Sequence, residues 1–97
     1  MMNFDAGVVE AMDVIPQLRK FLETESAAAS SASTVLPDDD LLELGLIDSL
    51  TLLKLVSFLE QSFGISVFDE DLIKENFSTM NNIQIFITNK IENKGQS

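Results

Sequence analysis

The stretch LGLIDSLTLLKLVSFLEQSFG, residues 44–64, decides the fold of this chain. Asp48 stands where a helix N-cap is expected, and Gly64 stands where a left-handed C-cap is expected. The large apolar residues between them recur at helical spacing on one face: Leu52, Leu55, Val56, Leu59 and Phe63. Polar residues fall on another face: Thr51, Lys54, Ser57 and Glu60. We therefore predict a helix from Asp48 to Phe63.

Two more long helices are predicted, one on each side of this element. Apolar residues spaced by three and four predict a helix from Val14 to Glu25. The region from Met80 to Glu92 has an alternating apolar pattern that also fits a strand, but a lone strand would have no partner, so we expect a helix. The acidic run Asp69-Glu70-Asp71 predicts a short helix with acids at its positive end. The fold class is therefore all-α.

The chain is short enough for one domain, residues 1–97. We expect a poorly defined N-terminus over residues 1–12, because Pro16 would interrupt a helix running on from there. The Ser/Ala tract predicts an exposed flexible loop over residues 26–37, and residues 93–97 should form a frayed tail. A short turn over residues 41–45, ended by Gly45, should pack on the core through Leu41, Leu42 and Leu44.

Composition excludes several function classes. The chain has a net charge of -10, so it would repel the phosphates of a nucleic acid. It contains no His, Cys, Trp or Tyr, which removes the commonest general base, the thiolate nucleophile and the usual zinc ligands. No apolar run approaches the roughly 18 residues of a membrane span, and the N-terminus lacks the features of a signal peptide. These observations predict a cytoplasmic monomer without a metal site.

Ser49 is the residue with the most chemical interest. It follows the Asp48 cap and takes the first helical position, where backbone N–H groups lack partners within the helix and the helix dipole is positive. We expect its hydroxyl to point outward, and a phosphodiester would be tolerated there because anions bind helix starts. On the residues alone, an ordinary serine behind an aspartate cap explains the pattern as well.

Three motifs at matching separations carry a family resemblance. They are Gly45-Leu46-Ile47-Asp48-Ser49-Leu50, then Phe63-Gly64-Ile65, then Asp69-Glu70-Asp71. Over roughly residues 38–91 the sequence resembles the acyl carrier and peptidyl carrier protein family. The resemblance implies a four-helix bundle of three longer helices and one short one, with a long loop after the first helix. It implies no catalytic residue.

The resemblance also implies a cofactor and a set of partners. Ser49 matches the serine that carries 4'-phosphopantetheine, moved from coenzyme A by a phosphopantetheinyl transferase. A thiol must arrive on such a group, since the chain has no Cys. The cargo would be an acyl or aminoacyl thioester, loaded by a ligase and used by downstream acyl-transfer enzymes. The implied recognition residues are Asp48, Leu50, Leu53, Lys54, Ser57 and Glu60.

Departures from the family pattern bear on the pathway. Lys54 weakens the acidic helix face of fatty-acid-type carriers, Phe68 replaces a common proline, and the loop before Pro37 is long. The resemblance is compatible with fatty-acid, polyketide and nonribosomal-peptide-type biosynthesis. The departures favour a specialised carrier over one of fatty-acid synthesis. The alternative is an unmodified acidic helical adaptor that binds a basic protein partner. A hydrolase using Ser49 would lack its histidine base.

Overall fold

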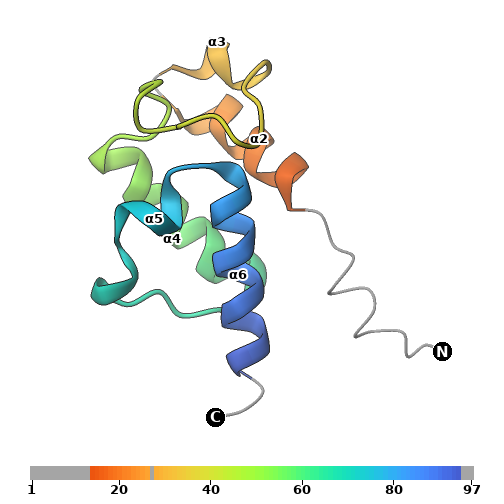
Figure 1. Ribbon diagram of the computed structural model, residues 1–97, viewed down its shortest axis with the longest axis vertical. Helices are drawn as coiled ribbons and strands as arrows, with labels where there is room; N and C mark the ends of the chain where they lie inside the picture. The colour runs from red at the N-terminus through yellow and green to blue at the C-terminus, as the bar shows by residue number, and fades with distance from the viewer. Residues whose placement is uncertain (1–13, 27, 95–97) are drawn as a thin grey trace, which may run out of the picture.

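The computed structural model describes residues 14–26 and 28–94, which form helices joined by turns (Figure 1). The elements in chain order are α2 (Ile15–Glu25), α3 (Ala29–Ala32), α4 (Ser49–Phe63), the 3₁₀ turn η1 (Asp69–Asp71), α5 (Lys74–Phe77) and α6 (Met80–Lys94). No strand occurs in these ranges. The all-α prediction is confirmed, with α2, α4 and α6 as the three longer helices and α5 as the short one between α4 and α6.

The core lies where the three long helices meet. Its most deeply buried members come from all three helices and from the loop before α4: Leu18, Leu22, Leu41, Leu46, Leu55, Leu59, Met80, Ile83 and Ile87. The predicted turn over residues 41–45 is confirmed for Leu41, which is fully buried. It is wrong for Leu42 and Leu44, which are exposed because one irregular turn can direct only part of its side chains inward.

The segment 26–37 was predicted to be an exposed loop, and that prediction is wrong in part. Ala32 and Val35 are buried in it, and Ala32 is the last residue of a one-turn helix, α3. The Arg19 guanidinium donates hydrogen bonds of 2.8 Å to the backbone carbonyls of both residues. This arginine on α2 therefore ties the segment to the body of the protein through two of its backbone carbonyls.

The beginning of α6 is set by its own capping residue. The Thr79 hydroxyl accepts a hydrogen bond of 3.0 Å from the backbone N–H of Asn82, as expected of an N-cap threonine. The helix then continues through Lys94, two residues beyond the predicted end, so residues 93 and 94 of the predicted tail over residues 93–97 belong to α6. Residues 95–97 and the predicted N-terminal segment over residues 1–12 lie outside the described part of the chain.

The burial pattern of α4 generates a stability prediction. Leu59 is 0% exposed and Leu53 is 62% exposed on the same helix. Leu59→Ala should lower the free energy of unfolding by about 2–5 kcal/mol, because it leaves a cavity in the core. Leu53→Ala is the matched control and should change it by no more than about 0.5 kcal/mol. Urea unfolding followed by circular dichroism measures both, and equal losses would contradict this description of the core.

Candidate functional site

The backbone leading into α4 is fixed by local and long-range hydrogen bonds. Gly45 has a φ of 74°, which a glycine adopts without strain. The N–H groups of Leu46 and Ile47 donate to the Leu41 carbonyl at 2.9 and 3.3 Å, and both side chains are buried. The buried Ser26 hydroxyl donates to the Leu46 carbonyl at 2.7 Å. The end of α2 is thereby tied to the residues that position the start of α4.

Asp48 caps α4, as predicted. Its backbone is extended, and its Oδ1 accepts a hydrogen bond of 2.8 Å from the Thr51 N–H. The backbone N–H and hydroxyl of Thr51 hold the pKa of the Asp48 carboxyl below its ordinary value of 3.8. Thr51 itself is only 3% exposed, so its predicted place on a polar face is wrong. It lies one helical turn before Leu55 and therefore shares the buried face.

Ser49 is the first residue of α4, and its side chain is exposed. Within the described residues its hydroxyl has no hydrogen-bond partner inside the protein. The N–H groups of Ser49 and Leu50 lie in the first turn, where a helix has no carbonyl to offer them. An exposed hydroxyl beside two such N–H groups fits a phosphodiester, since it leaves room for the group and favours its negative charge.

The outer face of α4 continues from Ser49 as an exposed surface. Leu50 and Leu53 are 61% and 62% exposed, so neither side chain packs in the core. Lys54 and Ser57 are exposed on the same side. We call these four residues with Ser49 the α4 outer face. It presents leucines, hydroxyls and one cation, and none of its members is acidic.

Glu60 does not belong fully to that face. Its carboxylate Oε2 accepts a hydrogen bond of 2.9 Å from the Val67 backbone N–H, and the residue is half-buried. It therefore holds the segment that follows α4. The C-cap is confirmed next to it, because Gly64 has a φ of 67° and its N–H donates to the Glu60 carbonyl at 3.0 Å.

The one cation of the α4 outer face pairs across to α2. The Lys54 Nζ lies 3.5 Å from the Glu25 Oε1, with both side chains substantially exposed. Such an exposed pair contributes little to stability, since water and salt screen it. Lys54 therefore stays accessible to a partner, and Glu25 is a neighbour that sequence spacing gave no reason to select.

The acidic run after α4 has a structural role that differs from the prediction. Asp69–Asp71 form a 3₁₀ turn, and the short α-helix begins only at Lys74. Asp71 Oδ2 accepts from the Phe68 N–H at 2.9 Å and pairs with the Lys90 Nζ at 2.7 Å. Lys90 also lies 4.4 Å from the centre of the Phe68 ring. The hydrogen bond from Lys90 and that from the Phe68 N–H lower the pKa of the Asp71 carboxyl.

Among the residues that the structure describes, no group of three or more acidic side chains is arranged to hold a metal ion. None of the helices found over residues 14–26 and 28–94 has the length and hydropathy needed to cross a membrane.

The fold and the site together define a class of protein. A helical domain that presents an exposed serine at a capped helix start is suited to carrying a covalently attached group. A family model described as "Phosphopantetheine attachment site" matches residues 25–83, well over half of the chain. The chain belongs to this family of non-catalytic carrier proteins, whose prosthetic group is 4'-phosphopantetheine, added by a phosphopantetheinyl transferase. No curated protein matches the sequence.

The lowered pKa of Asp48 predicts how the cap responds to acid. A carboxyl whose pKa is lower in the folded state stabilises that state at neutral pH, and this contribution disappears as the pH falls through the folded-state pKa. Asp48→Ala should therefore be less stable than the wild type at pH 7, and the difference should shrink below pH 3.8. The melting temperatures of both proteins, measured at a series of pH values from about 2 to about 7, test this prediction because that range spans the titration of carboxyl groups.

Asp69→Ala provides the control for that series. The Asp69 side chain is exposed and accepts no hydrogen bond within the part of the chain that the structure describes. Its removal should lower the melting temperature at pH 7 by much less than Asp48→Ala does. A stability difference for Asp48→Ala that stays constant down to the lowest pH would contradict the capping role of the carboxylate.

Proposed function

We propose that Ser49 is the attachment residue and that the protein holds an acyl or aminoacyl intermediate as a thioester on its 4'-phosphopantetheine arm. The observation that carries the proposal is the exposed Ser49 hydroxyl, without a partner among the described residues, at a capped helix start inside the matched region. The arm supplies the thiol that the chain lacks.

Each part of this site has a separate task in the proposal. The Ser49 hydroxyl is the acceptor of the group, and it is exposed enough for a transferase to reach. Asp48 keeps the helix start in place, so that the phosphodiester would lie at the positive end of the α4 dipole. A cargo tethered there reaches partner active sites at a high effective concentration, which spares the carrier any catalytic group of its own.

The α4 outer face supports recognition of partners. Leu50 and Leu53 flank the attachment residue and leave large apolar surfaces in water, the kind of exposure that marks a contact site. Lys54 and Ser57 add polar contacts, and Asp48 lies at the entrance. The family resemblance also implies a recognition role for Glu60. Its carboxylate accepts a hydrogen bond from the Val67 N–H, so Glu60 contributes less than the other residues to partner recognition. The partners are the transferase, a loading ligase and downstream acyl-transfer enzymes.

The chemistry of that face also supports a specialised pathway. Lys54 is exposed where fatty-acid-type carriers present an acidic helix, so a purely basic partner surface would not complement it. We favour polyketide or nonribosomal-peptide-type biosynthesis over fatty-acid synthesis on this ground. We also propose a cytoplasmic location, because loading consumes coenzyme A and that donor is available in the cytoplasm.

Loading of Ser49 can be tested with the purified apo-protein. Incubation with coenzyme A and a broad-specificity phosphopantetheinyl transferase should add the mass of one phosphopantetheine to the wild type. Ser49→Ala should gain none and keep its helical circular dichroism, because its side chain is outside the core. Ser62→Ala, an exposed serine on the same helix but outside the α4 outer face, is the control and should load normally.

The same experiment decides against the proposal if the outcome differs. Loading of Ser49→Ala would place the arm on another residue. An unmodified wild type, under conditions that load a reference carrier, would leave the acidic adaptor as the better interpretation. That adaptor would bind its partner equally well with and without Ser49.

The contribution of the leucines is a separate prediction. The double variant Leu50→Ser, Leu53→Ser should lower the kcat/KM of loading about tenfold, which corresponds to about 1.4 kcal/mol of lost contact. Ile85→Ser is the control, since Ile85 is 57% exposed on α6, away from the α4 outer face. Steady-state kinetics of the transferase measure both. Equal losses of kcat/KM in the double leucine variant and in Ile85→Ser would contradict a specific contact between these leucines and the transferase.

A further inference from the structure

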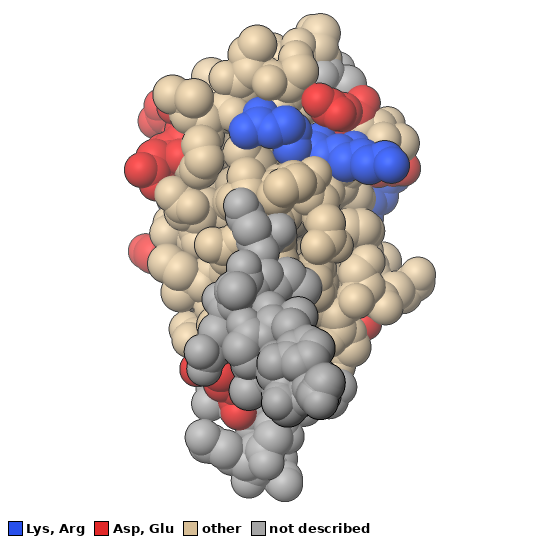
Figure 2. All heavy atoms as spheres, turned by 90° about the vertical axis from the view of Figure 1, so that its right-hand side faces the viewer, with Lys and Arg blue, Asp and Glu red and all other residues tan. Residues whose placement is uncertain are grey.

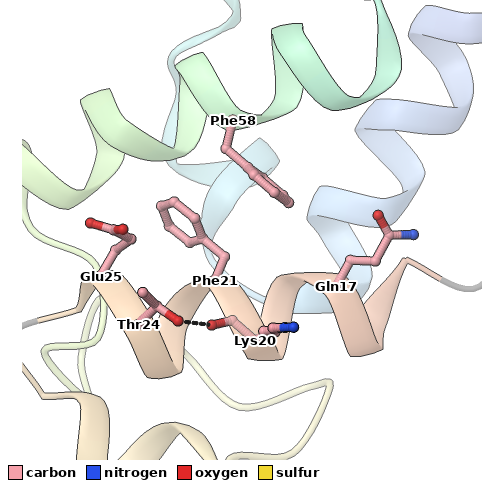
Figure 3. Close-up of a pocket in the computed structure, with 6 residues that line it drawn as sticks. All are labelled: Gln17, Lys20, Phe21, Thr24, Glu25 and Phe58. Atoms are coloured by element: carbon pink, nitrogen blue, oxygen red, sulfur yellow. Dashed lines mark hydrogen bonds between the residues drawn. The ribbon is translucent and has the colours of Figure 1, made fainter.

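A hollow lies between α2 and α4, beside the α4 outer face. Its volume is about 350 Å³, and the residues that line it are Gln17, Lys20, Phe21, Thr24, Glu25 and Phe58. The rings of Phe21 and Phe58 lie against one another with their centres 5.1 Å apart (Figure 3). Phe58 is only partly buried, and the Phe63 ring lies edge-on to it at 6.4 Å. Contacts with two neighbouring rings therefore hold this partly exposed side chain in place, so the hollow is preformed.

The hollow is continuous with the α4 outer face through Lys54. This lysine comes four residues before Phe58 on α4, so the two side chains are neighbours on the helix surface. The Lys54 Nζ also lies 3.5 Å from the Oε1 of Glu25, which lines the hollow. From Ser49 to Phe58 the helix advances by about 13 Å. A standard interface buries about 800 Å² on each partner, a patch roughly 30 Å across, so a protein that covers Ser49 also reaches the hollow.

Charged side chains give the rim of the hollow a direction. Glu25 lies at one end, and Lys20 lies nearer to Gln17 at the other end (Figure 3). Within the described residues the Lys20 ammonium has no ion-pair partner, whereas the Glu25 carboxylate faces Lys54. The Thr24 hydroxyl between them donates to the Lys20 carbonyl at 2.9 Å, so its proton is used inside α2. Figure 2 shows that basic and acidic side chains also adjoin in the upper part of one side of the molecule. The hollow is therefore apolar in its middle, with opposite charges toward its two ends.

We propose that this hollow is a docking pocket for the phosphopantetheinyl transferase, which places one large apolar side chain against Phe21 and Phe58. The transferase would carry an acidic group opposite Lys20 and a basic group opposite Glu25, and the two charges would fix one orientation. Side chains that fill preformed pockets contribute most of the binding energy of a protein interface. The inference rests on the proposed attachment of the arm at Ser49, because the transferase must reach that residue.

Filling the hollow from within the carrier tests the docking pocket. Thr24 is exposed, and Thr24→Phe would put a ring where the apolar side chain of the transferase belongs. In steady-state loading by a purified broad-specificity transferase, the KM for this variant should rise about tenfold and kcat should stay the same, because only binding is lost. Asn89→Phe adds the same ring at an exposed position of α6 and is the control, with an unchanged KM.

Reversing the direction of the rim provides a second test, which stays valid if Thr24→Phe fails to fold. The double variant Lys20→Glu, Glu25→Lys exchanges the two charges and keeps the net charge at -10. Steering by the net charge is therefore unchanged, and only the local pattern differs from the wild type. The KM for loading should rise several-fold. Lys20→Arg keeps the sign of the charge and should load like the wild type.

Four outcomes would overturn the docking pocket. An unchanged KM in these variants, in a protein that loads, removes the docking pocket and leaves the attachment at Ser49 intact. A fall in kcat at constant KM shows that the hollow acts on the position of Ser49 and does not bind the transferase. A wild type that never loads removes both proposals. Sedimentation equilibrium covers another occupant: a wild-type dimer that Thr24→Phe abolishes shows a second copy of the chain in the hollow.

Discussion

The hydrogen bond from the Thr51 backbone N–H to the Asp48 carboxylate fixes where α4 begins, and the rest of the site depends on it. With the start set at this residue, Thr51, Leu55 and Leu59 turn toward the core. The opposite side of the helix must then turn toward water, which brings out Ser49 and the leucines beside it. Successive residues lie about 100° apart around the helix axis, so residues three and four apart share a face and the exposed residues follow one side of α4.

A carrier needs an attachment residue that is exposed and also held in one place. In this protein, polar contacts between residues distant in sequence hold the attachment region in place. Ser26 reaches the Leu46 carbonyl across twenty residues, and Arg19 binds the carbonyls of Ala32 and Val35. These bonds tie the long segment between α2 and α4 to the body of the protein. They satisfy backbone groups that would otherwise be buried without partners, a loss that costs about 1–3 kcal/mol for each group.

The local features were predictable from the sequence because their signals are local. The Asp48 cap and the Gly64 C-cap depend on residues within one helical turn. Apolar spacing predicted the first two long helices, whereas the third was predicted because a lone strand would have no partner. The family motifs gave the expected role of Ser49 in the same way. What sequence could not give were contacts between distant residues, such as the carboxylate of Glu60 on Val67 or the burial of Ala32. Thr51 was misplaced because its polar character suggested water, while its helical position four residues before Leu55 places it in the core.

The attachment of the arm to one particular oxygen is the claim on which the whole account depends. Proteolytic peptide mapping by tandem mass spectrometry, on the protein purified from its native cells, tests it most directly. The account predicts one phosphopantetheine per chain, located at Ser49, together with the fragment ions of whatever cargo it holds. A modification located on another residue, or an unmodified Ser49 peptide in cells whose other carriers are loaded, would contradict it.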